Sequence, residues 1–99
     1  MAHRLAQRAE ADLDNIWLYV AKESSSVETA NRLIDTLTER FFTLARHPYV
    51  GRMRDEDLGP GYRTFPVDEY VIVYCVENED VLILRVVHGR RQLDTLFGH

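Results

Sequence analysis

Residues 70–88, Tyr-Val-Ile-Val-Tyr-Cys-Val-Glu-Asn-Glu-Asp-Val-Leu-Ile-Leu-Arg-Val-Val-His, decide the fold of this 99-residue chain. Two runs rich in β-branched and aromatic residues, Tyr70–Val76 and Val81–His88, flank a polar segment, Glu77–Asp80. Such residues favour strands, and an asparagine between them readily adopts the left-handed conformation of a tight turn. The stretch therefore predicts an antiparallel β-hairpin with Asn78 as its left-handed residue.

Alternation along the second run predicts which of its side chains share a face. One face would hold Val81, Ile83, Arg85 and Val87, and the other Leu82, Leu84, Val86 and His88. An arginine in so apolar a strand needs a partner or access to solvent. We expect Arg85 to pair with a nearby carboxylate, namely Asp68, Glu69 or Glu77.

Upstream of the hairpin, Tyr62–Val67 alternates well enough for a third strand, and Pro66 places the end of that strand at an edge or a bulge. Residues 52–61 are charged and contain a Gly-Pro-Gly turn. They are expected to form an exposed loop that could begin with a short strand.

Two amphipathic helices are predicted before this loop, because apolar residues recur there at three- and four-residue steps. The first begins near Gln7, and its stripe comprises Ala9, Leu13, Ile16, Trp17 and Val20. The stripe of the second comprises Ala30, Leu33, Ile34, Leu37, Phe41, Leu44 and Ala45. Ser25 and Glu28 have the spacing of a capping box, and Pro48 stops the second helix. Helices joined by so short a turn pack antiparallel.

With Arg4–Ala6 as a first strand, the order becomes β-α-α-β-β-β, followed by a tail over residues 90–99. This order predicts an α+β fold in which the antiparallel helical hairpin covers one face of a mainly antiparallel sheet. The other face is expected to be partly open. The length suits one domain, residues 1–99, with one modest core.

Composition narrows the function classes. Twelve basic and sixteen acidic residues give a net charge of −4, which argues against indiscriminate nucleic-acid binding. A single cysteine excludes an intrachain disulfide and fits a cytoplasmic protein. No run is long enough to span a membrane, and residues 1–5 lack the apolar region that a secretory signal would have, so neither feature is expected. No metal-ligand spacing occurs, so no metal is expected, and no cofactor is expected either. His88 remains a candidate general base, or a histidine hydrogen-bonded at the sheet end.

Several phrases carry a resemblance to a known family. They are Ala9-x-x-Asp12-Leu13-x-x-Ile16-x-x-Tyr19, His47-Pro48-x-x-Gly51, Gly61-Tyr62-Arg63, Tyr70-Val71-Ile72-Val73-Tyr74 and Val86-Val87-His88-Gly89-Arg90-Arg91. In this order and spacing they resemble the RelE/ParE superfamily of toxins from bacterial type II toxin–antitoxin modules. The resemblance implies the same β-α-α-β-β-β fold.

The superfamily holds two chemistries. RelE-like members are ribosome-dependent mRNA endonucleases, whereas ParE-like members inhibit DNA gyrase. The resemblance places the two nuclease arginines on Arg63 and Arg91, but the nuclease tyrosine falls on Phe97. The nuclease lysines fall near Arg54 and Glu56. The groups that bind phosphate are thus retained, while those that move protons are largely missing.

We therefore expect a ParE-like gyrase inhibitor that binds its target through Arg63, Arg90, Arg91 and Phe97. Two alternatives remain. One is an mRNA endonuclease that uses His88 with Arg63 and Arg91, or His88 with Arg63 and one of Glu56 or Glu69, and the other is an inert toxin fold. All three imply a ParD-like antitoxin and a toxin–antitoxin hetero-oligomer. The apolar helical residues expected to contact the antitoxin are Trp17, Ile34, Leu37 and Phe41.

Overall fold

The computed structural model describes residues 1–89 of the chain. Its elements follow the predicted order, and the charged loop begins with a two-residue strand, as the sequence allowed. They are β1 (His3–Leu5), α1 (Gln7–Ser24), α2 (Val27–Arg46), β2 (Arg52–Met53), β3 (Arg63–Val67), β4 (Tyr70–Glu77) and β5 (Asp80–His88). The predicted tail, residues 90–99, lies outside the described residues.

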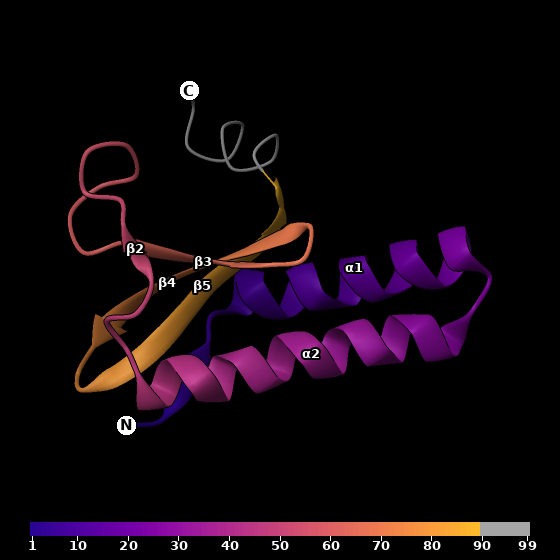
Figure 1. Cartoon of the computed structure of the whole chain (residues 1–99), viewed down its shortest axis with the longest axis horizontal. Helices are drawn as coiled ribbons and strands as arrows, with labels where there is room; N and C mark the ends of the chain where they lie inside the picture. Colours follow the sequence, from indigo (N-terminus) through magenta and orange to yellow (C-terminus); the bar gives the residue numbers. More distant parts are fainter. Residues whose placement is uncertain (90–99) are drawn as a thin grey trace.

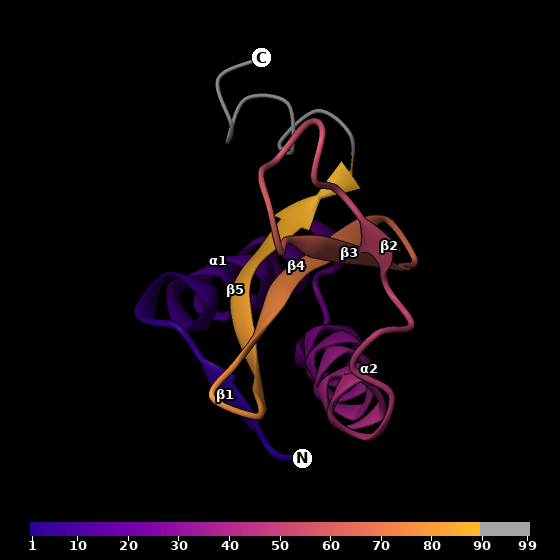
Figure 2. The same ribbon diagram turned by 90° about the vertical axis from the view of Figure 1, so that its left-hand side faces the viewer.

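The strands form one mixed sheet in the order β1-β5-β4-β3-β2. Only β1 runs parallel to its neighbour, and the other pairs are antiparallel. In Figure 1 the two helices lie side by side and antiparallel. Figure 2 shows β1 at one edge of the sheet and β2 at the other. The predicted α+β fold is confirmed.

The main core lies between the helices and the sheet. Its largest fully buried side chains are Tyr74, Phe41, Leu37, Leu44, Ile72 and Ile83. On the opposite face, Val73 and Val87 form a second, smaller cluster, and Leu58 packs on it from the charged loop. That loop therefore covers part of the face predicted to be open. Among residues 1–89, neither helix has the length and apolarity needed to cross a bilayer.

The hairpin turn confirms the left-handed Asn78 and adds a second such residue. Asn78 has a φ of 52° and Glu79 a φ of 66°, and Glu77 pairs with Asp80 across the turn. Two central residues with positive φ give the turn the twist that suits a two-residue hairpin loop.

A bulge between β4 and β5 corrects the predicted faces of β5. The register shifts at Val73 and Tyr74, so the alternation of β5 changes phase after Ile83. Val86 consequently packs in the main core with Ile83, whereas Leu84 packs on the opposite cluster. The prediction that Val86 shares a face with Leu84 is wrong, because strict alternation assumes a ladder without an extra residue.

The serine turn between the helices is capped one residue later than predicted. Ser25 ends α1 in the left-handed conformation, with a φ of 55°. Ser26 is the N-cap of α2, and its hydroxyl accepts a hydrogen bond from the Thr29 N–H at 3.1 Å. The expected Ser25–Glu28 box is therefore wrong, since Ser25 is needed to reverse the chain.

Candidate functional site

Arg63, the first predicted site residue, lies at the start of β3 and supports the segment after α2. Its Nη1 donates to the carbonyl oxygen of Tyr49 at 3.0 Å and to that of Gly51 at 2.8 Å. Its guanidinium carbon also lies 5.2 Å from the centre of the Tyr49 ring, which is within cation–π range. Arg63 therefore ties residues 49–51 to the sheet.

Tyr74 secures the same segment from the core side. Its buried hydroxyl donates to the Pro48 carbonyl at 2.9 Å and accepts from the Gly51 N–H at 2.8 Å. Burial raises the pKa of the Tyr74 phenol, and the Gly51 hydrogen bond and the Arg63 charge oppose that rise. A Cβ at position 51 would lie 2.9 Å from Tyr74 Cζ, too close for any side chain. The His47-Pro48-x-x-Gly51 phrase thus has a structural explanation.

His88 lies at the other end of the sheet from Arg63. It pairs with Tyr70 at the start of β4, whereas Arg63 pairs with Tyr74. These positions are four residues apart on β4 and on opposite sides of it, roughly 13 Å along and 10 Å across the sheet. The His88 ring contacts the Tyr70 ring edge to face at 5.4 Å, and its Nε2 lies 3.7 Å from a Glu69 carboxylate oxygen. Arg63 and His88 therefore do not converge on one point.

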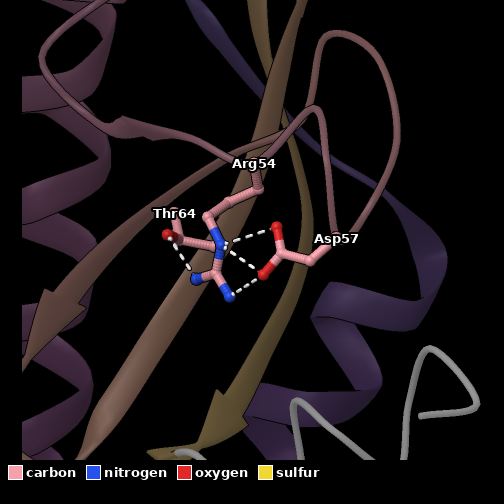
Figure 3. Close-up of polar contacts among 3 residues, drawn as sticks. All are labelled: Arg54, Asp57 and Thr64. Atoms are coloured by element: carbon pink, nitrogen blue, oxygen red, sulfur yellow. Dashed lines mark hydrogen bonds and ion pairs between the residues drawn. The ribbon is translucent and has the colours of Figure 1, made fainter.

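Arg54, near a position where the resemblance places a nuclease lysine, is held by two neighbours (Figure 3). Its Nε donates to both carboxylate oxygens of Asp57, at 2.9 and 3.1 Å, and its Nη2 also bonds that carboxylate. Its Nη1 donates to the Thr64 hydroxyl at 3.2 Å. The hydrogen bond from Arg54 holds the pKa of Asp57 below its usual value. The Arg54 charge is thus already matched by a carboxylate within the loop.

A cleft of about 610 Å³ lies between α1 and the ends of β4 and β5. Its lining comprises Asp12, Asn15, Ile16, Tyr19, Tyr70, Arg85, Val86 and His88. Arg85 is paired here with Asp12, through Nε at 2.7 Å and Nη2 at 2.9 Å. The prediction that Arg85 pairs with Asp68, Glu69 or Glu77 is wrong. The packing of α1 on the sheet instead brings Asp12, 73 residues away in the sequence, to Arg85. The Asp12 hydrogen bond raises the Arg85 pKa.

The residues expected to contact an antitoxin divide into two groups. Leu37 and Phe41 are core residues, with 0% and 1% exposure, so their side chains are not available to a partner in this conformation. Trp17 and Ile34 line a groove of about 420 Å³ along the seam between α1 and α2, together with Leu13, Glu10 and Asp14. The Trp17 indole N–H donates to Asn31 at 2.8 Å.

The remaining predicted residues, Arg90, Arg91 and Phe97, lie outside the described residues. Within residues 1–89, no group of three His, Cys, Asp or Glu side chains is placed to hold a metal ion. Sequence reasoning missed Asp12 and Tyr74 as organising residues. Both stand in the family-like phrases, but their partners come from distant parts of the chain.

Solved structures with this architecture define the class of protein. The chain matches a chain in the structure of the chromosomal ParDE toxin–antitoxin system from P. aeruginosa, with a TM-score of 0.79 and 23% identity. The match covers 91% of this chain and 97% of the matched chain. It matches the toxin–antitoxin complex RelBE2 from Mycobacterium tuberculosis with a TM-score of 0.64 and 26% identity, over 88% and 95%. The fold is that of toxins from type II toxin–antitoxin modules.

Sequence relatives narrow the class to one family. Residues 4–93 match the family model described as ParE toxin of the type II toxin–antitoxin system parDE. Toxin ParE3 of Caulobacter vibrioides is 37% identical over 88% of this chain and 85% of that protein, and toxin ParE1 is 38% identical over 87% and 86%. Toxin RelE3 of the same organism is 31% identical over 86% and 90%. The chain belongs to the ParE toxin family.

Proposed function

We propose that this toxin arrests growth by binding and inhibiting DNA gyrase, and that it catalyses no reaction itself. One observation carries the proposal: Arg63, expected to bind phosphate in a nuclease, does not converge with His88, the candidate general base. Arg54 is paired with Asp57, and Arg63 is bound to backbone carbonyls far from His88. Phe97 stands where the nuclease tyrosine would be, and it has no proton to give.

The expected loss of catalytic power is large. A positioned general acid or base typically contributes about 10²–10⁴-fold to a rate, so a nuclease without one would be slow. A binding inhibitor needs no such group, because it acts by occupying its target. The net charge of −4 also opposes entry into the RNA-rich decoding site of a ribosome.

A ribosome-dependent mRNA endonuclease is the second candidate. It is favoured by the similarity to toxin RelE3 and by the position of His88 in the cleft beside Tyr19 and Arg85. In that case His88 would act as the general base. Gyrase inhibition would change DNA supercoiling, whereas an endonuclease would cut transcripts.

Induction of the toxin alone, with plasmid topology and RNA integrity measured in one culture, separates them. Gyrase inhibition predicts relaxed plasmid, intact transcripts and a purified toxin that blocks supercoiling. His88→Ala should then retain growth arrest, as should the control variant His47→Ala at an exposed loop histidine. Discrete transcript cuts that vanish in His88→Ala but persist in His47→Ala would overturn the proposal.

We further propose that a small ParD-like antitoxin neutralises the toxin in a hetero-oligomer formed in the cytoplasm. The groove between the helices supports this, since its lining includes the apolar side chains of Leu13, Trp17 and Ile34. An antitoxin segment that folds on binding could cover it. The toxin produced without such a partner is expected to aggregate, and co-expression of the neighbouring small open reading frame should keep it in solution and restore growth.

A further inference from the structure

Besides the groove between the helices, an exposed surface lies at the β2 edge of the sheet, opposite β1. We call it the edge patch, and it comprises Tyr49, Val50, Arg52, Met53 and Arg63. Its three apolar side chains are 64%, 55% and 58% exposed, although they lie within five consecutive positions. Large apolar side chains clustered in this way, beside arginines, are typical of protein interfaces.

The structure holds the edge patch in its exposed arrangement. The bonds from Arg63 to the Tyr49 and Gly51 carbonyls fix the segment from one side, and those of the Tyr74 hydroxyl fix it from the other. Met53 pairs with Arg63 across the β2–β3 ladder, so the two side chains share a face with the Tyr49 ring. A surface that is already ordered loses little conformational entropy when a partner binds.

The backbone of β2 offers a further means of recognition. This strand is the last in the sheet order. The Arg54 N–H donates inward to Tyr62 at 2.9 Å, so the alternation along the strand turns the amide and carbonyl of Met53 outward. An extended segment of another protein could pair with these groups.

Charge indicates which kind of segment fits. The edge patch contains two arginines, Arg52 and Arg63, and no acidic residue, in a chain whose net charge is −4. Asp57, an acid of the adjoining loop, is bound by Arg54. A second copy of the chain would bring the arginines of the two copies together, and a nucleic acid would gain little from the apolar side chains. An extended segment with carboxylates beside an apolar residue suits the edge patch best.

The helical groove has the opposite character. Glu10 and Asp14 border it, so it favours a partner segment with basic residues. Two surfaces of opposite charge select two different partners. We propose that the edge patch docks an extended acidic segment of DNA gyrase, while the helical groove is left to the antitoxin. This inference rests on the proposed gyrase inhibition and adds the chemistry and location of the contact.

Opposite charges at one position test the inference. Purified full-length toxin carrying Met53→Glu should inhibit supercoiling at least about tenfold less than the wild type, because it places a carboxylate against the acidic segment. Met53→Lys alters the same exposed side chain with the favourable sign and should stay within about threefold. Leu18→Glu introduces an acid at an apolar residue of α1 that is 60% exposed, and should inhibit like the wild type. Thermal melting verifies that all four proteins are folded.

Each other outcome overturns the inference. If Met53→Glu inhibits as well as the wild type, or if Met53→Lys is equally weakened, no acidic segment docks there. If both variants inhibit gyrase normally but lose antitoxin binding, the edge patch serves the antitoxin instead. If the wild type itself leaves supercoiling unchanged, the proposed function fails and the inference fails with it.

Discussion

The Asp12 carboxylate on α1 receives two hydrogen bonds from the Arg85 guanidinium and a third, at 2.9 Å, from the Val86 N–H. Strand β1 pairs with β5 only at Val81–Ile83, so within residues 1–89 no strand lies on that side of β5 beyond Ile83. Asp12 bonds the backbone where that strand is missing. It thereby fixes α1 to the half of β5 that forms the cleft.

Asp12→Ala should lower the free energy of unfolding by about 2–4 kcal/mol. The substitution leaves a mostly buried arginine and a strand N–H without their acceptor, and such a loss is costly at a site where the two side chains are only 13% and 18% exposed. Urea denaturation followed by circular dichroism measures the change. Asp14→Ala, an exposed carboxylate of the same helix, should change stability by less than about 0.5 kcal/mol. Equal losses in both variants would contradict the assigned role.

Tyr74→Phe should lower stability at neutral pH by about 1–3 kcal/mol, because the Gly51 N–H and the Pro48 carbonyl lose their buried partner. Tyr49→Phe removes an exposed hydroxyl and should leave stability unchanged at that pH. Chemical denaturation at pH 7 makes the comparison. A Tyr74→Phe protein as stable as the wild type would show that the hydroxyl is dispensable.

The same tyrosine predicts alkaline sensitivity. Burial raises the Tyr74 pKa in the folded state above the value of about 10 in the unfolded chain. Above that pH the unfolded state releases a proton that the folded state retains, so stability is complete below pH 10 and falls as pH rises through the folded pKa. Denaturation midpoints between pH 9 and about 11 should fall less steeply in Tyr74→Phe than in the wild type, although Tyr70, whose pKa burial also raises, contributes to both. Identical slopes would refute this.

The two adjacent serines should respond oppositely to substitution. Ser26→Ala removes the α2 N-cap and should cost about 1 kcal/mol. Ser25→Gly should leave the free energy of unfolding unchanged or raise it by about 0.3 kcal/mol, because glycine adopts the positive φ at that position without steric cost. Thermal denaturation of the two variants decides the matter. A larger loss for Ser25→Gly than for Ser26→Ala would place the cap at Ser25.

Trp17→Ala should weaken antitoxin binding by about tenfold or more, because it removes one wall of the groove between the helices. Phe42→Ala, at an exposed aromatic residue of α2 outside that groove, is the matched control and should bind normally. Isothermal titration calorimetry with the purified antitoxin gives both affinities. If the two variants bind equally well, the antitoxin uses another surface.

Local sequence determined the order and type of the elements. The turn at Asn78, the two apolar stripes and the β-branched runs each depend on residues close together in the chain, so spacing alone reveals them. The chain also carries family-like phrases from end to end, so its amino acids alone indicate the class of toxin. One bulged residue is enough to defeat the prediction of the β5 faces, since a shift of one position reverses every later side chain.

Only the tertiary structure decided which distant residues meet. Proximity along the chain suggests Glu69 or Glu77 as the partner of Arg85, but its carboxylate comes from a helix 73 residues away that crosses the strand. Leu37 and Phe41 belong to the same apolar stripe as Ile34, and packing against the sheet alone determines which of them is buried. The separation of Arg63 from His88 likewise follows from strand register, because register depends on the pairing of whole strands and leaves no mark in the spacing of single residues.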